Sequence, residues 1–325
     1  MNQENPFARA LKKSNIKEIA PVIILLCMLL VLNTLNKEFM SFKTLFNMMQ
    51  QVSAVGIVAI GAMIVIISGG IDFTAGYGLA MIGMAAGTVF AADIMGGSIL
   101  VVALTCLLAG AAVGALNGVL VAKLNIVPFI ATLAVMSLLQ GMSMLIGHGN
   151  MVMIREPSIL WLGQGKLFQN IPVSFVLYVI LCFTAYLILH KTKMGVYIFA
   201  LGGNEDTVRY VGINVVKYKI LLYLIAGVYT GIAALLTVSK LGLAAPSIYG
   251  STLLDAIAAA VIGGTSLSGG RGKILGTFVG TIIIVLITTA LTYLNIRPEM
   301  QDVFKGAVIL LALCFDVFIT KISKE

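Results

Sequence analysis

Long apolar runs recur along almost the whole of this 325-residue chain, and they limit its possible folds more than any other feature. Each run has roughly 18 to 25 residues, enough for a helix to cross the hydrocarbon core of a bilayer, about 30 Å thick. A spanning β-barrel would instead need strands of about ten residues with alternating polarity, and the sequence lacks that alternation. With 60% hydrophobic residues, the chain is predicted to be an all-α polytopic membrane protein.

The runs predict ten transmembrane helices that form a single domain over residues 1–325. The predicted spans are 19–36, 50–69, 76–92, 98–122, 126–146, 172–190, 218–238, 253–266, 274–294 and 303–320. With both termini in the cytoplasm, the cytoplasmic segments hold fourteen Lys and Arg and the opposite side holds seven, out of 21 in total. This asymmetry follows the positive-inside rule. The basic segment before the first run could be a secretory leader, but no small-residue cleavage site follows it, so we expect a retained first span.

Two predicted loops are long enough to do more than connect helices. The first, at about 147–171, is predicted outside the cell membrane and carries Trp161, the only tryptophan. It mixes apolar with charged residues, which suits a helix on the membrane surface or a docking face. A loop that packs its apolar residues onto helix ends is an equal alternative. The second loop, at about 191–217, is predicted in the cytoplasm.

The stretch "ALGGNEDTVRYVGIN" is the most informative part of the second loop. Gly202 and Gly203 are expected to break the chain, and Asn204 or Asp206 then caps a short helix that Gly212 closes. The exposed charges of this helix would be Glu205, Asp206 and Arg209. A short helix flanked by glycines fits the cleft of another protein, and a surface helix that binds only lipid headgroups is the alternative.

A polar interruption, "ISGGIDFTAG", separates the second and third predicted spans and contains one carboxylate, Asp72. Gly69 and Gly70 allow one helix to stop there, and Asp72 or Thr74 is predicted to cap the next. The alternative is that a broken helix end lines a polar path, since irregular backbone at membrane depth is tolerated only where protein or water covers it. The other polar candidates are Asn117, Gln140 and Asp255. Each of them could face a cavity, and interhelical hydrogen bonding or a helix cap is at least as good an explanation.

The same interruption has a possible echo near the C-terminus. "SGGIDFTAGYG" (68–78) aligns with "IGGTSLSGGRG" (262–272), so that Gly69 falls on Gly263 and Gly70 on Gly264. Glycine-rich turns also align by chance in a chain with 34 glycines, so an internal repeat is only one of two interpretations.

Enzyme chemistry finds little support in the sequence. The stretch "LSGGRGKILGT" lacks both the first glycine and the Ser or Thr of a phosphate-binding loop, and no GxSxG or HExxH motif occurs. The four cysteines are scattered through apolar runs without CxxC spacing. We therefore expect no catalytic residue, no metal site and no cofactor bound by this chain.

Five stretches together carry a family resemblance. They are "ISGGIDFTAG", "GALNGVLVAKLNIVPFIATL", "ALGGNEDTVRYVGINV", "LDAIAAAVIGGTSLSGGRG" and "KGAVILLALCFD". With them, residues 45–316 resemble the membrane permeases of bacterial ATP-binding cassette (ABC) importers, in the branch that takes up ribose, galactose and related sugars, including autoinducer-2. The common family form of the first stretch is closer to I-D-L-S-V-G, so Phe73, Thr74 and Ala75 are conservative variations.

The resemblance implies a ten-helix importer subunit of the type II architecture, in a homodimer or a heterodimer with a sister permease around a translocation path. Two cytoplasmic ATPase subunits, which bind ATP and Mg²⁺, and a periplasmic sugar-binding protein would complete the importer in the bacterial inner membrane. The family's coupling helix falls on Gly203, Asn204, Glu205, Asp206, Thr207, Val208, Arg209 and Tyr210. The candidates for the path are Gly69, Gly70, Asp72, Thr74, Asn117 and Asp255.

A secondary transporter driven by protons or sodium is the alternative with a different mechanism. It would use a membrane-embedded carboxylate, Asp72 or Asp255, and would transport a small polar solute without an ATPase. The stretch "GGNEDTVRYVGIN" favours the sugar branch over related importers of vitamins or metal chelates.

Overall fold

The structure is a computed structural model that describes residues 41–94, 96–167, 170–247, 252–308 and 310, and, before them, residues 23, 25, 26, 28–30, 32, 34 and 39. The helices are α3 (Phe42–Ile67), α4 (Ala75–Ala91), α5 (Ile99–Ala122), α6 (Pro128–Ile146), α7 (Pro157–Gln164), α8 (Val173–Lys191), α9 (Lys193–Gly203), α10 (Glu205–Tyr210), α11 (Val215–Leu241), α12 (Thr252–Ile262) and α13 (Ile274–Tyr293). The strands are β1 (Val152–Met153), β2 (Lys166–Leu167), β3 (Ile171–Pro172) and β4 (Leu243–Ala244).

The described part of the chain is a bundle of apolar helices, as the sequence predicts. Six of these helices, α3, α5, α6, α8, α11 and α13, are long and apolar enough to cross a membrane, and α4 and α12 are shorter apolar helices. All eight coincide with predicted spans. The first and last predicted spans, 19–36 and 303–320, lie largely outside the described residues, so the count of ten remains a prediction.

Two predicted boundaries differ from the structure by more than three residues. Helix α3 begins at Phe42 rather than at residue 50, because Ser41 caps it through a hydrogen bond from the Thr44 amide to the Ser41 hydroxyl oxygen at 3.3 Å. Helix α12 ends at Ile262 rather than at residue 266, because Gly264 adopts a left-handed conformation, with φ at +87°. Glycine takes up such a conformation without steric cost, and it is a common end of helices.

The predicted cytoplasmic loop 191–217 is also largely helical, since it contains α9 and α10. Ile198 and Leu201 of α9 are buried, so an apolar face holds this segment against the rest of the bundle. The prediction of a loop was wrong for residues 193–203, because the polar and glycine residues of this stretch obscure its apolar face in the sequence.

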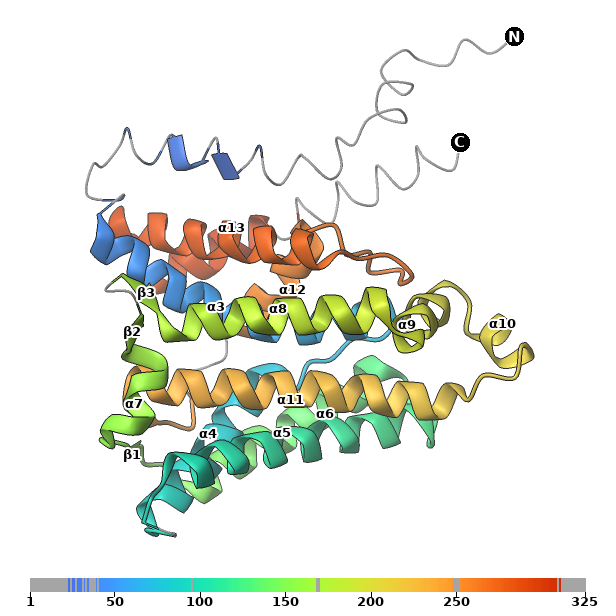
Figure 1. The fold of residues 1–325 in the computed structure, drawn as a ribbon, viewed down its shortest axis with the longest axis horizontal. Helices are drawn as coiled ribbons and strands as arrows, with labels where there is room; N and C mark the ends of the chain where they lie inside the picture. Colours follow the sequence, from blue (N-terminus) through green and yellow to red (C-terminus); the bar gives the residue numbers. More distant parts are fainter. Residues whose placement is uncertain are drawn as a thin grey trace.

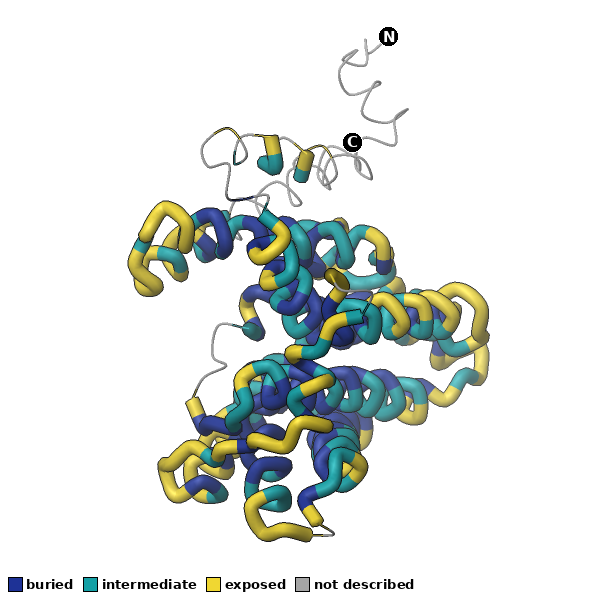
Figure 2. The backbone as a smooth tube through the Cα atoms, turned by 60° about the vertical axis from the view of Figure 1, so that its left-hand side comes forward, coloured by how far each residue is buried: buried dark blue, intermediate teal, exposed yellow. Residues whose placement is uncertain are grey.

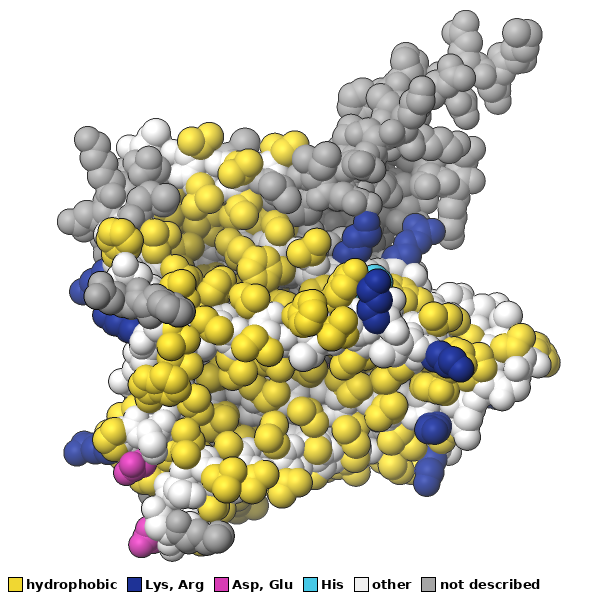
Figure 3. Space-filling model, in the orientation of Figure 1, with side chains coloured by type: hydrophobic (Ala, Val, Ile, Leu, Met, Phe, Trp, Pro, Cys, Tyr) yellow, Lys and Arg dark blue, Asp and Glu magenta, His cyan; other side chains and the backbone are white. Residues whose placement is uncertain are grey.

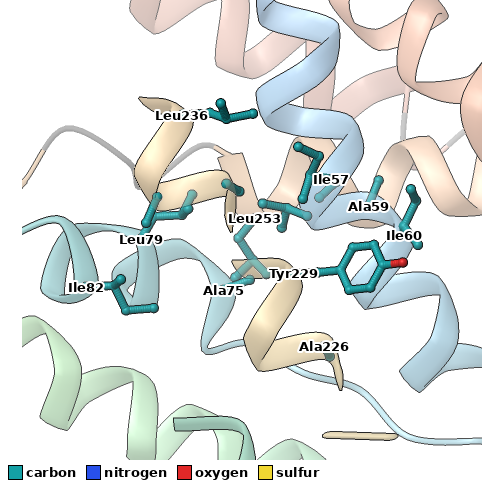
Figure 4. Packing of buried hydrophobic residues seen from close by; sticks show 14 of the residues in the cluster. Ile57, Ala59, Ile60, Ala75, Leu79, Ile82, Ala226, Tyr229, Leu236 and Leu253 are labelled. Carbon is teal, nitrogen blue, oxygen red and sulfur yellow. The ribbon is translucent and has the colours of Figure 1, made fainter. Parts of the chain in front are cut away.

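Helices α3 and α11 run through the centre of the bundle (Figure 1). Figure 4 shows Ile57 and Ile60 of α3 near Leu79 of α4, Tyr229 of α11 and Leu253 of α12, and all five are buried. Figure 2 shows that exposed residues concentrate on the outer helices and on the segments that join helices. The large exposed apolar side chains of the outer helices fit a lipid-facing surface.

Glycines bring two helix pairs into backbone contact. Gly110 and Gly114 of α5 lie against Gly227 and Gly231 of α11, and a Cβ atom added at Gly110 would come within 2.9 Å of the Gly231 Cα. Gly276 of α13 faces the end of α12 in the same way. Small residues at such positions allow close helix packing, on which membrane bundles depend for stability.

Two groups of short elements lie at opposite ends of the bundle (Figure 1). Helix α7 and the four short strands lie at one end, and α9 and α10 lie at the other. Figure 3 shows Lys and Arg side chains near both ends, with a mostly hydrophobic surface between them. The predicted 147–171 and 191–217 segments therefore lie on opposite sides of the hydrophobic zone.

The segment 147–171 packs onto helix ends. The Gln50 side-chain amide of α3 donates to the Gly163 carbonyl of α7 at 2.7 Å, and Val152 of β1 pairs with Ala244 of β4. Trp161 is 50% exposed, so half of its side chain remains outside this packing. The structure supports the packing interpretation for the body of the segment.

Candidate functional site

The first candidate site is α10, the short helix at the end of the bundle opposite α7 (Figure 1). The Asn204 side-chain oxygen accepts a hydrogen bond from the Thr207 amide at 2.9 Å, which confirms Asn204 as the cap. The helix ends where Gly212 adopts a φ of +80°, and the Ile213 amide donates to the Val208 carbonyl at 3.3 Å. The predicted helix, its cap and its glycine end are therefore confirmed.

The predicted break at Gly202 and Gly203 lies one residue later, at Asn204. Both glycines are the last residues of α9, and the chain leaves the helical conformation only at Asn204, where φ is −162°. The physical reason lies in packing. Gly202 is so close to the backbone of neighbouring segments that a side chain would overlap them, so its small size matters more than its flexibility.

Helix α10 is attached to the bundle by one apolar contact and one ion pair. Val208 is buried with Leu201 of α9 and Val215 of α11 in a small separate cluster. Glu205 pairs with Arg209 at 3.3 Å and also with Lys219 of α11. The prediction placed Glu205 among exposed charges, but its side chain is only 36% exposed because it connects α10 to α11.

The remaining surface of α10 points away from the bundle. Tyr210 is 89% exposed and Val211 is 68% exposed, although both are apolar enough to be buried elsewhere. The Arg209 side chain is 62% exposed beside them. A projecting helix with an exposed aromatic ring and an arginine has the composition that is typical of binding hot spots.

The second candidate site is the irregular segment between α3 and α4. The Asp72 carboxylate accepts two hydrogen bonds from Thr74, from the amide at 2.8 Å and from the hydroxyl at 2.6 Å. Asp72 is 7% exposed, and it holds the backbone immediately before α4 in place. The side chain of Thr74, the N-cap residue, makes no cap bond of its own. Of the two predicted caps, Asp72 is therefore the one that binds the backbone.

Asn117 of α5 extends this hydrogen-bonded group across the bundle. Its side-chain nitrogen donates to the Thr74 hydroxyl at 3.0 Å, and its side chain is fully buried. Among the described residues, neither the Asn117 side-chain oxygen nor the Tyr223 hydroxyl has a hydrogen-bond partner, and the Tyr223 hydroxyl lies next to Gly70. Three residues that the sequence named separately, Asp72, Thr74 and Asn117, thus form one chain of hydrogen bonds.

Protein covers the irregular segment on its other sides. The Thr132 hydroxyl of α6 donates to the Ile71 carbonyl at 3.3 Å, and the Phe73 ring meets the Phe129 ring edge-on at 5.4 Å between centroids. Because Gly70 contacts Tyr223, about two turns inside α11, the segment lies within the bundle. Such irregular backbone is stable at membrane depth only when it is covered in this way.

Asp255 lies apart from this group, in a separate ion pair. Its carboxylate accepts a hydrogen bond from the Lys305 side chain at 3.1 Å, and the two residues are 8% and 9% exposed. Asp302 is also within 3.9 Å of Lys305. The sequence prediction placed Lys305 at the edge of a span and missed this pairing, because the two residues are 50 positions apart. Gln140, by contrast, is exposed on α6.

The predicted echo between 68–78 and 262–272 has a structural counterpart with a different register. The left-handed residues are Gly69 and Gly264, with φ of +82° and +87°, so Gly69 corresponds to Gly264 rather than to Gly263. In both places the amide of the next residue donates to a carbonyl five positions earlier. Helix α6 and α13 end with the same hydrogen bonds, so this common cap by itself does not indicate a repeat.

The described residues offer few groups for metal chemistry. No three His, Cys, Asp or Glu side chains gather closely enough to hold a metal ion in the part of the chain that the structure describes. The arrangement provides hydrogen-bonding side chains inside an apolar bundle and a projecting helix at one end.

Comparison with known proteins decides the family. The model of a family described as "Branched-chain amino acid transport system / permease component" matches residues 44–313, most of the chain. The chain belongs to this permease family. The matched residues include the irregular segment with Asp72, helix α10 and the Asp255–Lys305 pair.

Three curated relatives of this permease are sugar import proteins by name. The ribose import permease protein RbsC of Escherichia coli (strain K12) is 38% identical over 312 residues, which cover 95% of this chain and 96% of the relative. RbsC of Bacillus subtilis (strain 168) is 35% identical, with 92% of each chain covered. The galactose/methyl galactoside import permease protein MglC of Escherichia coli (strain K12) is 30% identical, with 93% and 94% covered. No solved structure matches the permease.

Proposed function

We propose that this permease is the membrane-spanning subunit of an ABC importer and that it forms the translocation path for a sugar of the ribose or galactose type. The observation that carries the proposal is the 38% identity to a ribose import permease over 95% of the chain. The family description names branched-chain amino acids instead, but the three relatives compared above are all named as sugar permeases.

The buried charges support a neutral substrate. Among the described residues, the only buried charged side chains are Asp72, Asp255 and Lys305. Asp255 and Lys305 pair with each other, whereas both hydrogen bonds from Thr74 go to the same oxygen of Asp72, so Asp72 is the buried charge on which the ion-coupled alternative depends. A sugar carries no charge and needs hydroxyl-binding groups rather than a compensating ion, whereas an ion-coupled transporter needs a carboxylate that is free to bind its ion.

The partners of the permease would bind at the two ends of the bundle. The cytoplasmic ATPase subunits would bind α10 through Tyr210, Arg209 and Val211. A periplasmic sugar-binding protein would bind the end of the bundle that carries α7. A second permease, identical or a sister chain, would complete the path along which Gly69, Gly70, Asp72, Thr74, Asn117 and Asp255 are candidates. ATP and Mg²⁺ would be bound by the ATPase alone, and both termini of the permease would lie in the cytoplasm.

Import would follow from the free energies of two conformations. If the ATP-bound ATPase binds the outward-open permease better than the inward-open one, ATP binding shifts the population outward, and hydrolysis reverses the shift. The permease then contributes geometry, and the bond chemistry takes place in the ATPase.

Reconstitution in vesicles tests this proposal. The permease, its ATPase and its binding protein are inserted together, and the uptake of radiolabelled ribose, galactose and leucine is measured with and without ATP. We expect ATP-dependent uptake of a sugar and none of leucine. Leucine uptake would support the family description instead, and sugar uptake by the permease alone under a proton or sodium gradient would support the ion-coupled alternative.

A further inference from the structure

Three segments that are distant in the sequence meet at their backbones near the base of α10. The Gly270 amide, in the turn between α12 and α13, donates to the carbonyl of Ile67 at 2.8 Å. Ile67 is the last residue of α3, and its carbonyl is one of the groups that a helix end leaves without an internal partner. This bond joins the ends of α3 and α12–α13.

Gly202 of α9 packs against both of these segments where they meet. A Cβ atom added at Gly202 would overlap both the Ile67 carbonyl oxygen and the Gly270 amide nitrogen. From the other side, a Cβ atom added at Gly269 would come within 2.7 Å of the Gly202 carbonyl oxygen. The contact is therefore one of backbone against backbone, and only glycine at position 202 permits it.

Only a few residues separate this junction from α10, from Asp72 and from the start of α13. Gly202 stands two positions before Asn204, which caps α10. Ile67 stands five positions before Asp72, and Gly270 stands four positions before Ile274, where α13 begins. When α10 is displaced, the Gly202 backbone therefore presses directly on the ends of α3 and of α12–α13, with no flexible side chain between them.

We propose that Gly202 is a positioning residue that transmits the displacement of α10 to the α3–α4 break and to the α12–α13 turn, so that the three backbones move as one body. This proposal rests on the proposed function, since it needs a partner that moves α10. It adds the route by which that movement enters the bundle. Side chains can change rotamer and absorb a small displacement, whereas interlocked backbones cannot.

The direct test compares Gly202→Ala with Gly141→Ala in the full importer. Gly141 lies in α6 and has nothing within 4 Å of an added Cβ atom, so it controls for the change to alanine inside a helix. We expect the ATPase to stay bound to the Gly202→Ala variant and to keep hydrolysing ATP. Sugar uptake per ATP hydrolysed should fall by about tenfold, a factor within the range that typical coupling free energies produce. Unchanged uptake by Gly202→Ala would overturn the proposal, and so would loss of ATPase binding in parallel with uptake.

A second pair of variants approaches the junction from the opposite side. Gly269→Ala and Gly264→Ala introduce similar backbone strain, since the two φ values are +80° and +87°, but only Gly269 has neighbours within 4 Å. We expect Gly269→Ala to reduce uptake per ATP far more than Gly264→Ala does. Equal losses would show that strain rather than contact is responsible, which contradicts the proposal.

A cross-link tests the junction even if these variants fail to fold. A Cβ atom at Gly270 would lie 3.4 Å from the Gly203 Cα, whereas a Cβ atom at Gly203 has nothing within 4 Å. Because the two Cβ atoms do not face each other, cysteines at 203 and 270 are joined by a short, reducible bifunctional thiol reagent rather than by a disulfide. If the segments move as one body, the cross-linked double variant transports as well as the untreated one. Uptake that stops on cross-linking and returns when the cross-link is reduced would overturn the proposal, as would absence of the cross-link. ATP-driven uptake by the unmodified importer is measured first, so a failure of the proposed function is recognised separately.

Discussion

The two buried carboxylates of this permease are held in different ways. Asp72 is 7% exposed and takes its hydrogen bonds from Thr74, two residues away in the same turn. Asp255 is 8% exposed and takes its partner, Lys305, from a segment 50 positions away. One acid thus fixes local backbone, and the other joins α12 to the helical segment after α13 that carries Lys305. Within the described residues, both have structural partners, so a buried carboxylate in a transporter need not be an ion-coupling site.

The difference predicts unequal sensitivity to mutation. A local hydrogen bond to a neutral group stabilises a fold by about 1 kcal/mol, whereas a buried charge that loses its partner destabilises it by roughly 3–5 kcal/mol. Loss of Lys305 should therefore matter more than changes around Asp72.

The largest effect is expected for Lys305→Met. This variant leaves the Asp255 carboxylate buried without a cation, and we expect it to lower the free energy of unfolding by about 3–5 kcal/mol. The measurement is a denaturant series on the detergent-solubilised permease, followed by its circular dichroism. Stability equal to that of the unmodified permease would show that the pair does not hold α12 to the segment that carries Lys305.

The companion variants refine this result. Asp255→Asn should cost less than Lys305→Met, because Asp302 remains within 3.9 Å as a second acid for Lys305. The double variant, Asp255→Asn with Lys305→Met, should recover part of the loss, since it leaves no unpaired charge. A double variant that is less stable than Lys305→Met would contradict the ion-pair account.

A smaller effect is expected for Thr74→Val. It keeps the shape of the side chain but removes one hydrogen bond to Asp72 and the acceptor for Asn117, at a cost of about 1–3 kcal/mol in the same denaturant series. Thr88→Val in α4 is the control, because its hydroxyl bonds only to the carbonyls of Met84 and Ala85 in its own helix. Equal effects of the two variants would mean that the chain of hydrogen bonds through Thr74 adds nothing.

The smallest effect is expected for Asp72→Asn. The asparagine oxygen can still accept both bonds from Thr74, so we expect a change below about 1 kcal/mol and sugar uptake close to that of the unmodified importer. Uptake in reconstituted vesicles checks this result. Abolished uptake with normal stability would give Asp72 a role in transport beyond holding the start of α4, and would revive the ion-coupled alternative.

The sequence predicted most of what depends on local pattern. Apolar runs predicted eight helices of the bundle, and cap chemistry predicted Asn204 and Gly212 at the ends of α10. Asp72 and Thr74 were found because a carboxylate stands out in an apolar chain. Each of these signals lies within a few residues, where propensity and capping act directly.

Contacts between distant segments could not be predicted in this way. The bond from Asn117 to Thr74 joins α5 to the start of α4, and the Lys305–Asp255 pair joins residues 50 positions apart. Gly202 was interpreted as a chain breaker, because a sequence cannot distinguish a glycine that turns the chain from one that allows close packing. Both uses follow from the missing side chain, and only the neighbours decide between them.

If an ATPase moves the permease through α10, the exposed face of this helix lies against the ATPase in the assembled importer, and a photo-cross-link can capture that contact. A photoreactive benzoylphenylalanine replaces Tyr210, which is 89% exposed on α10, or Trp161, which is 50% exposed on α7 at the opposite end. In the assembled importer, we predict that position 210 cross-links to the ATPase subunit and that position 161 does not. A cross-link from position 161 to the ATPase, or from position 210 to the sugar-binding protein, would contradict the account.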